Sequence, residues 1–527
     1  MAPPPPMKTT RPRPSFSYHN HHHPDRTTVG ATRGWGGGGG KVSIRNIALF
    51  CLLKALAVCI VGVFYGSFAI HRLLLPNDDG DAYPPSKIGD RLVVPPLPFL
   101  SSSSSSSSST AMIDAAERRP SVAYVVSITG CGNDALSVKR GYGEMQAMNL
   151  VVQGAAVLRH SIHLAHNDGA HSTSSAASTS GGGGSRYDYE MHAMVHPSAI
   201  RCSKNLHRLG YIVHVRNTPF DRDDIRDEYY RSVVDGASCC GSKEYIKLYA
   251  YTLTRHDVAV ILDLDSLILR PLDDLFDALL QSSSSSSSTT SSWWSKVPVH
   301  RHDDDGGRRD DGNANNDDNA TSSSSSVVEA LYTRDYNMIG EGNEMYAGVQ
   351  GGFLMVRPSE RSFQEYIELV LEGNYKENHG WGGKYGWAFG GAQIQGICAY
   401  YYLMVHPDRG IELDRCKVNA MVDSPRFEKS GRCRDGREKC DDCRDTPLED
   451  VLSAHFTLCG KPWECSARGG LCSGLHSEWF RIRRSFEGSR TDVSDDERNL
   501  PDLGAAYRPE LYHGYCTGPG GYLPIKF

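Results

Sequence analysis

A run of apolar residues that ends in two aspartates constrains the fold of this chain more than any other stretch. Residues 258–262 have the sequence VAVIL and are followed by Asp263, Leu264 and Asp265. A short, continuous apolar run of this kind is typical of a strand that is buried on both faces of an α/β sheet. Open α/β sheets bind their ligands beyond the carboxyl ends of the strands. We therefore expect a ligand site beside the two aspartates.

The two carboxylates indicate a cation in that site. Acids that leave one strand side by side repel each other unless a cation lies between them. Hard oxygen ligands together with a diphosphate suit Mg²⁺ or Mn²⁺. The pattern favours a metal–diphosphate site, and with it a sugar-nucleotide enzyme. The alternative is that Asp265 only caps the turn after the strand.

Hydrophobic periodicity predicts strands and helices that alternate along the chain. The predicted strands are 123–129, 211–215, 258–262, 349–356 and a short one at 455–457; the predicted helices are 144–163, 243–253, 272–280, 359–372 and 390–402. Alternation of this kind indicates one mostly parallel α/β sheet.

Low-complexity segments divide the 527 residues into parts. The predicted parts are a disordered cytosolic tail (1–45), a membrane anchor (46–70), a low-complexity stem (71–119), the α/β domain (120–490) with disordered insertions at about 166–186 and 282–326, and a C-terminal tail (491–527). The 56 Lys and Arg nearly balance the 62 Asp and Glu, so charge does not indicate a nucleic-acid partner.

The apolar segment 46–70 is long enough to cross a bilayer, which needs about 20 residues. It contains Lys54, which can snorkel to the near interface. Basic residues precede the segment and acidic residues follow it, which predicts a type II anchor with a cytosolic N-terminus. The alternatives are a buried core helix and a cleaved signal peptide.

Fifteen cysteines are present, and six of them crowd late in the chain. These six are Cys433, Cys440, Cys443, Cys459, Cys465 and Cys472. In an oxidising lumen such a cluster indicates disulfides. The alternative is a zinc site built on Cys440 and Cys443, although a second Cys-x-x-Cys at zinc-ribbon spacing is missing.

Several short segments, in this order along residues 122–465, resemble glycosyltransferase family 8, to which glycogenin belongs. They are the strand 123–129, YIKL at 245–248, DLD at 263–265, LDDLF at 272–276, QGG at 350–352, GGAQ at 390–393, and His455 followed by KPW at 461–463. The resemblance implies a GT-A fold, which is a single Rossmann-like nucleotide-diphospho-sugar transferase domain. It also implies a UDP-sugar donor, Mn²⁺ (or Mg²⁺) and a retaining reaction.

The resemblance also assigns roles to individual residues. It implies that Asp263, Asp265 and His455 hold the metal, and that Lys461 offsets charge on the donor phosphates. Further donor contacts are implied for four residues: Thr129, Lys247, Leu264 and Gly460. The alternatives are a satisfied core histidine for His455, solvated lysines for Lys247 and Lys461, and an ordinary strand-end residue for Thr129.

The chain departs from the family pattern at three places. Gln350 stands where the family usually has an asparagine and is expected to face the sugar. Ala392 replaces a family aspartate, which leaves Gln393 or Gln395 for a polar role near the sugar. Leu458 replaces a glycine of the loop before Lys461. Because an amide is not an anionic nucleophile, the missing acid favours a front-face displacement without a protein nucleophile.

We therefore expect a metal-dependent, Golgi-membrane hexosyltransferase with a lumenal catalytic domain and a glycan or protein acceptor. Trp381 and Trp387 are candidates for stacking on an acceptor sugar. The alternative is a non-catalytic lumenal binding or scaffold protein on a degenerate transferase fold, which the substitution at Ala392 favours. A disulfide-rich secreted interaction protein is a third hypothesis, and the long α/β alternation argues against it.

Overall fold

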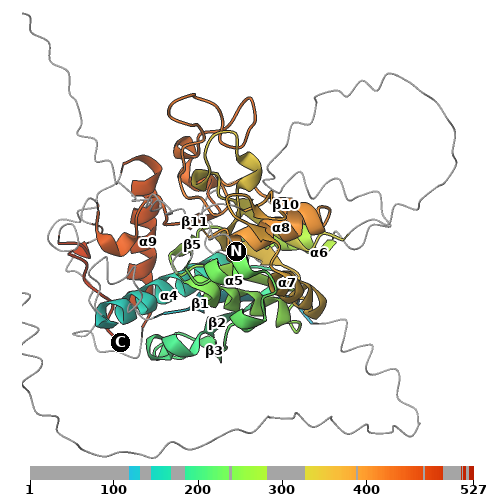
Figure 1. Cartoon of the computed structure of the whole chain (residues 1–527). Coiled ribbons are helices and arrows are strands. Elements are labelled where there is room, and N and C mark those ends of the chain that lie inside the picture. Colours follow the sequence, from blue (N-terminus) through green and yellow to red (C-terminus); the bar gives the residue numbers. More distant parts are fainter. Residues whose placement is uncertain are drawn as a thin grey trace, which may run out of the picture. The chain divides into compact units, whose positions relative to one another are not determined.

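The apolar run before the two aspartates forms strand β4 (Val258–Leu262), and all five of its residues are buried. It lies in the middle of a seven-stranded sheet of order β10-β6-β7-β4-β1-β2-β3. The other strands are β1 (Ser121–Ile128), β2 (Asp188–Val195), β3 (Tyr211–Val215), β6 (Ala330–Arg334), β7 (Val349–Val356) and β10 (Gly410–Glu412). Figure 1 shows the sheet with its helices around it.

The computed structural model describes residues 118–130, 144–167, 184–236, 240–281, 327–386, 390–466, 469–490, 512, 514–517 and 521–527. All of them belong to the unit formed by residues 105–527. The predicted tail 1–45, anchor 46–70 and insertion 282–326 lie outside the described residues. Within the described ranges, no helix is both long and apolar enough to cross a bilayer.

The strand pairing confirms the predicted mostly parallel α/β sheet. β1 pairs in parallel with β2 and β4, β2 with β3, and β6 with β10. Only β7, among the strands of this sheet that the structure describes, runs against its neighbours β4 and β6. The carboxyl ends of β1, β2, β3, β4 and β6 therefore lie at one edge of the sheet.

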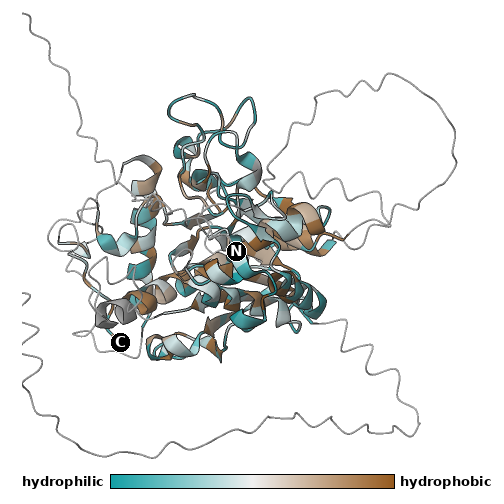
Figure 2. Cartoon of the chain, viewed as in Figure 1, coloured by the Kyte–Doolittle hydropathy of each residue, from teal (hydrophilic) through white to brown (hydrophobic). Residues whose placement is uncertain are grey.

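Two apolar layers cover the two faces of the sheet. One contains α4 (Glu144–Asn167), α6 (Asp273–Gln281) and α9 (Gly470–Ser489). The other contains α5 (Glu228–Val233), α7 (Glu360–Glu372), α8 (Ile394–Tyr400) and the 3-10 helix η4 (Gly241–Thr252). Figure 2 shows hydrophobic residues concentrated on α8 and the strands, and polar ones on the loop between β10 and β11.

Smaller elements join these layers. β5 (Ser266–Ile268) pairs antiparallel with β11 (Ser453–His455), and β8 (Tyr375–Lys376) with β9 (Gly380–Trp381). The remaining short helices are η2 (Pro197–Ser203), η3 (Arg222–Asp224), η5 (Tyr336–Met338), η6 (Glu344–Tyr346), η7 (Tyr401–Val405), η8 (Cys443–Asp445), η9 (Leu448–Asp450) and η10 (Pro462–Glu464).

The late cysteines form disulfides, so the zinc alternative at Cys440 and Cys443 was wrong. All six crowded cysteines are oxidised, together with Cys416 and Cys516. The pairs are Cys416–Cys443, Cys433–Cys440, Cys459–Cys472 and Cys465–Cys516. The last pair ties the segment before α9 to the end of the chain, whose Ile525 backbone N–H donates to Gln153 on α4.

Several elements differ from the sequence prediction. The predicted helix 243–253 is a 3-10 helix, η4, and α4 continues to Asn167 rather than ending at 163. The strand predicted at 455–457 is β11, which ends at His455. Strands β2, β5, β6 and β10 and helices α5 and α9 were not predicted. β2 begins with Asp188, Tyr189 and Glu190, which interrupt the apolar pattern of a buried strand, so its periodicity is weak.

Candidate metal and diphosphate site

The two aspartates leave β4 in a tight turn that the neighbouring strands fix. The Ser266 N–H donates to the Asp263 carbonyl (3.1 Å), and the Phe456 N–H donates to the Asp265 carbonyl (2.9 Å). The turn leads directly into β5, in which Ser266 is paired with His455 on β11. This pairing places a histidine from 190 residues later beside the two carboxylates.

Asp263, Asp265 and His455 form the carboxyl-end cluster. The His455 Nε2 atom lies 3.7 Å from one Asp263 oxygen and 3.4 Å from one Asp265 oxygen. One ligand atom from each residue lies within 4.8 Å of the other two. An octahedral ion with bonds of about 2.1 Å holds neighbouring ligand atoms about 3 Å apart, so a small contraction suffices to surround one. The predicted metal residues therefore converge.

A glycine beneath the cluster supports the same interpretation. A Cβ atom at Gly352 on β7 would lie 2.3 Å from the His455 Cε1 atom and 3.0 Å from an Asp263 oxygen. Any side chain at this position would push the ring out of the cluster. Two carboxylates, one imidazole and the space kept by Gly352 fit a divalent ion such as Mn²⁺ or Mg²⁺.

Leu264 lies between the two aspartates and packs against α4. A Cβ atom at Gly154 on α4 would lie 2.6 Å from the Leu264 carbonyl oxygen. The helix therefore approaches the turn as closely as a glycine permits, which fixes the backbone from which both carboxylates project. Leu264 contributes position, through its backbone and its partly buried side chain.

Lys461 forms an ion pair with Asp265. Its side chain is 26% exposed, so the ammonium group can be reached from solvent. Burial by itself would raise the pKa of Asp265, but the charges of Lys461 and His455 outweigh it and hold that pKa well below its usual range. Asp265 is therefore an anion at neutral pH, ready to bind a cation.

Lys247 is not a solvated helix lysine, because it is buried and all its donors are used. Its ammonium donates to Asp263 (2.9 Å), to Glu244 (3.2 Å) and to the Gly351 carbonyl (3.0 Å). Burial would lower the pKa of Lys247, but the two carboxylates outweigh it and raise that pKa. Lys247 therefore orients Asp263 from behind.

The remaining residues that were predicted to contact the donor lie near this cluster or at the end of a neighbouring strand. Thr129 follows β1, and its carbonyl accepts a hydrogen bond from Ser198. Gly460 has a left-handed backbone (φ 73°), and its carbonyl lies 3.2 Å from the His476 Nε2 atom. Leu458, in place of the family glycine, is partly exposed.

A buried acid, Asp335, was missed by the sequence reasoning. It follows β6, which ends at the same edge as β4, and it is 1% exposed. Burial and the carboxylate of Asp423 raise the pKa of Asp335 to about 6, while His455 and a hydrogen bond from Gln350 oppose this. Because β6 ends in Thr333 and Arg334, no continuous apolar run precedes Asp335, and periodicity did not single it out.

The two predicted catalytic glutamines lie in different surroundings. Gln350 is buried on β7, and its side-chain oxygen accepts from the Gly352 N–H (2.5 Å), so it lies next to the carboxyl-end cluster. Gln393 is fully buried and donates to the Val234 carbonyl (2.7 Å), so its amide nitrogen faces the packing of α5. The half-buried Gln395 lies closer to the site, because its side chain fills the space above Gly351 and Gly390.

Ala392, at the position of the missing family acid, is buried. Its carbonyl accepts hydrogen bonds from the hydroxyls of Tyr230 (2.9 Å) and Tyr245 (3.2 Å). Trp381 is also fully buried, with its indole N–H on the Gly391 carbonyl. Trp381 is therefore a core residue here and offers no face to an acceptor sugar, while Trp387 lies outside the described residues.

No protein-family model matches this sequence, and no curated protein matches it. Solved structures with a similar fold include the galactosyltransferase LgtC with donor and acceptor sugar analogs, at 13% identity and a TM-score of 0.36, over 71% of this chain and 99% of that one. They also include the bifunctional glycosyltransferase WbbM, at 10% identity and 0.35, over 69% and 50%. Mouse xyloside xylosyltransferase 1 matches at 12% identity and 0.31, over 64% and 97%.

These structural neighbours are glycosyltransferases. At TM-scores of 0.31 to 0.36, these likenesses carry no argument about this chain. The chemistry of the site itself has to support a function.

Proposed function

We propose that this protein is a metal-dependent glycosyltransferase that moves a sugar from a nucleoside-diphosphate sugar to an acceptor hydroxyl. The observation that carries the proposal is the carboxyl-end cluster, with Lys461 paired to Asp265 at the open edge of the sheet. Two carboxylates, an imidazole and a lysine suit a divalent ion with a diphosphate, and sheet edges of this type bind nucleotides.

Asp263, Asp265 and His455 would hold the ion, which when bound offsets charge on the departing diphosphate. Lys461 adds a second positive charge at the same place and can turn from Asp265 to a phosphate oxygen. Lys247 keeps Asp263 in one orientation through its 2.9 Å hydrogen bond. Gln350, which accepts from the Gly352 N–H, and Gln395, which packs against Gly351, would orient sugar hydroxyls.

If the reaction retains the anomeric configuration, as the resemblance implies, the absence of an acid at Ala392 favours displacement on one face of the sugar. The bond from the anomeric carbon to the phosphate oxygen breaks as the bond to the acceptor oxygen forms on the same face. The acceptor proton passes to the departing phosphate oxygen, so no protein nucleophile is required. Trapping a covalent glycosyl-enzyme would contradict this part of the proposal.

Several finer features extend the proposal. The ordered segments that resemble glycosyltransferase family 8 favour membership of that family, UDP as the nucleotide and a hexose as the transferred unit. The apolar segment 46–70 and the disulfides favour a type II protein of the Golgi membrane with a lumenal catalytic domain.

The test is hydrolysis of a panel of UDP-sugars by the full chain, with and without Mn²⁺. Asp263→Asn and Asp265→Asn should each lower turnover at least about a thousandfold, because a bound divalent ion contributes several kcal/mol. Asp274→Asn is the matched control, since this acid on α6 is 56% exposed and remote from the turn. Turnover that is unchanged in both variants would exclude the proposed site.

The second candidate function is a non-catalytic binding protein, which the alanine at 392 favours. Metal-dependent nucleotide binding, without turnover of any donor and without transfer to a panel of sugar and peptide acceptors, would support it. The Asp265→Asn variant separates the two functions further. It would abolish metal-dependent nucleotide binding in both cases, but it would lower a turnover rate only if the protein is an enzyme.

A further inference from the structure

A second group of potential metal ligands lies at the opposite end of the sheet. Glu190, His192 and His256, here the amino-end cluster, bring one ligand atom each to within 4.8 Å of the others. Glu190 and His192 project from one face of β2, and His256 precedes β4. A strand rises about 3.3 Å per residue, so His256 and Asp263, at the two ends of β4, are roughly 20 Å apart. The two clusters are separate sites.

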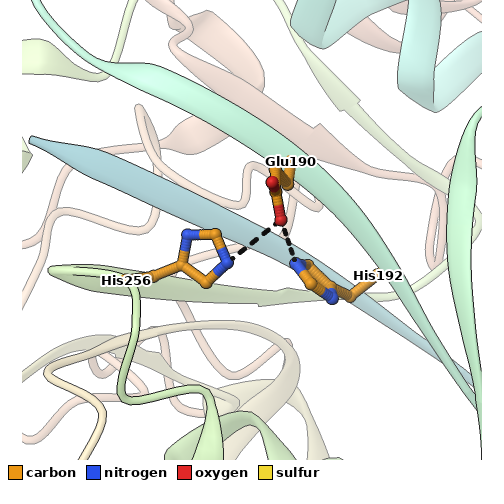
Figure 3. Close-up of side chains that lie close together, drawn as sticks. All are labelled: Glu190, His192 and His256. Atoms are coloured by element: carbon orange, nitrogen blue, oxygen red, sulfur yellow. Dashed lines mark ion pairs between the residues drawn. The ribbon is translucent and has the colours of Figure 1, made fainter. Parts of the chain in front are cut away.

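The register of the sheet brings these three residues together across β1. Ala123 on β1 lies opposite Glu190 on one side and Ala259 on the other. Because Ala123 carries only a methyl group, the carboxylate of Glu190 can lie over β1 toward His256. Figure 3 shows both imidazole rings directed at one carboxylate oxygen.

The distances within the cluster agree with tetrahedral zinc. The Glu190 Oε2 atom lies 3.4 Å from the His192 Nε2 atom and 3.3 Å from the His256 Nε2 atom. Zinc bonds of about 2.0–2.1 Å hold tetrahedral ligand atoms about 3.3 Å apart. Two imidazoles and one carboxylate leave a fourth position for water, which is a known zinc arrangement.

In the tautomer that is protonated on Nδ1, the ring nitrogens that face the carboxylate carry lone pairs. The hydrogen bond from Arg255 Nε to the His256 Nε2 atom (3.1 Å) agrees with this tautomer for His256. The His192 Nδ1 atom lies 3.0 Å from the His214 Nε2 atom, whereas its Nε2 atom has no hydrogen-bond partner among the described residues. A proton on Nδ1 of His192, donated to His214, leaves the Nε2 lone pair free. A ligating histidine usually donates its other N–H in this way.

Both rings are held in place by the packing around them. The His192 side chain is fully buried and the His256 side chain is 4% exposed.

Arg255 is the competing cation. Its guanidinium pairs with the same Glu190 oxygen and donates to the same His256 nitrogen that a metal ion would use. The Arg255 side chain is 58% exposed, so it can move into solvent without breaking the core. A purely structural ion pair among Arg255, Glu190 and His256 is the alternative that the experiment must exclude.

We propose that Glu190, His192 and His256 bind a zinc ion, with His214 holding His192 in its ligating orientation. The ion ties β2 to the start of β4 across β1 and displaces the Arg255 guanidinium. It is structural and independent of sugar transfer, because it lies at the other end of the sheet from the carboxyl-end cluster.

The test counts tight zinc sites on the full chain by competition with a chromogenic chelator. The sequence HNHHH at 19–23 offers further imidazoles to zinc, so only variants of the same full chain are compared. His192→Gln should bind one zinc ion fewer than the wild type, and His214→Ala should bind it about 10- to 100-fold more weakly. His207→Gln, which alters an exposed histidine outside the cluster, is the matched control and should bind as the wild type does.

An equal number of tight sites in the wild type and His192→Gln would overturn the proposal. If His192→Gln does not fold, Arg255→Met decides, because it changes only a half-exposed side chain. Removal of the competing guanidinium should tighten zinc binding. Unchanged or weaker zinc binding in Arg255→Met would show that the arginine, and not a metal ion, is the cation of this cluster.

Discussion

The two ends of the sheet carry clusters of opposite composition. The carboxyl-end cluster has two carboxylates and one imidazole, and the amino-end cluster has one carboxylate and two imidazoles. Lys247 and Lys461 pair with the carboxylates at one end, and Arg255 pairs with Glu190 at the other. The same scaffold therefore presents an oxygen-rich site and a nitrogen-rich site, which differ in the metal that they prefer.

The surroundings of the two clusters are alike in exposure. At the carboxyl end, the side chains of Asp263 and Lys461 are 33% and 26% exposed, and the His455 ring is 4% exposed. At the amino end, Glu190 is 43% exposed, and the rings of His192 and His256 are 0% and 4% exposed. Each cluster combines buried imidazole with a carboxylate that solvent reaches. The comparison teaches that ligand type, and not exposure, separates the two sites.

Removal of bound metal ions, followed by addition of one metal at a time, should distinguish the two clusters most strongly. We expect a chelator to abolish UDP-sugar turnover and to lower the unfolding temperature of the full chain. Added Mn²⁺ should restore turnover alone. Added zinc at 100 times its Kd should restore about 3 kcal/mol of stability. Assays of hydrolysis and thermal unfolding on one sample check this, and restoration of both properties by either metal alone would contradict the comparison.

Lys461→Met should lower kcat/KM for the sugar nucleotide about 100-fold, because a charge on the departing diphosphate is lost. Affinity for Mn²⁺ should rise at the same time, since Asp265 loses a competing cation. Steady-state kinetics and metal titration measure the two effects. Lys417→Met, at an exposed lysine paired with Asp450, is the control, and a fall in metal affinity for Lys461→Met would count against the assigned role.

Gly352→Ala should weaken Mn²⁺ binding about 10- to 100-fold, because the new methyl group displaces the His455 ring. Zinc binding at the amino end should not change. Isothermal titration with each metal tests this, with Gly469→Ala as control, since a Cβ atom there meets no other atom within 4 Å. Unaltered Mn²⁺ affinity would mean that His455 is not a ligand.

A smaller effect concerns the loss of stability at acid pH, and it involves a residue outside both clusters. His160 on α4 is buried against Ser485 on α9, and burial, with the charge of His163, lowers its pKa to about 4. The unfolded chain then binds more protons, so this stability is complete above the unfolded pKa of about 6.5 and is lost as pH falls toward 4. By pH 5.5 the loss is roughly 1 kcal/mol.

His160→Gln should remove that part of the acid sensitivity, as measured by chemical denaturation at pH 7.5 and 5.5. His207→Gln, at an exposed position, should leave it unchanged. An identical pH dependence of the unfolding free energy in wild type and His160→Gln would assign the acid sensitivity to other groups. Titrations of metal binding with acid would then need no correction for the contact between His160 and Ser485.

The sequence predicted the part of the site that is local in the chain. Asp263 and Asp265 follow an apolar run directly, so one periodicity argument placed both at the right edge of the sheet. His455 lies far away in sequence, and only the family resemblance pointed to it. Its position depends on the pairing of β5 with β11, and three-residue strands leave almost no periodic signal.

The amino-end cluster was not predicted at all, for a related reason. Its first two members lie on β2, where the polar residues at the start of the strand conceal the pattern. Its third member comes 64 residues after His192, and only the register of both strands on β1 brings them together. Asp335 escaped for a similar reason, because β6 ends in Thr333 and Arg334 and has no continuous apolar run like that before Asp263.

The disulfides around Lys461 make the site dependent on how the chain matures. Cys459–Cys472 encloses Lys461, and Cys465–Cys516 anchors the same loop to the end of the chain. In a reduced chain the two aspartates still follow β4 directly, but neither bond closes the loop that carries the lysine. Reduction should therefore loosen Lys461 and leave the carboxylates in place, which makes the site sensitive to the redox state of its surroundings.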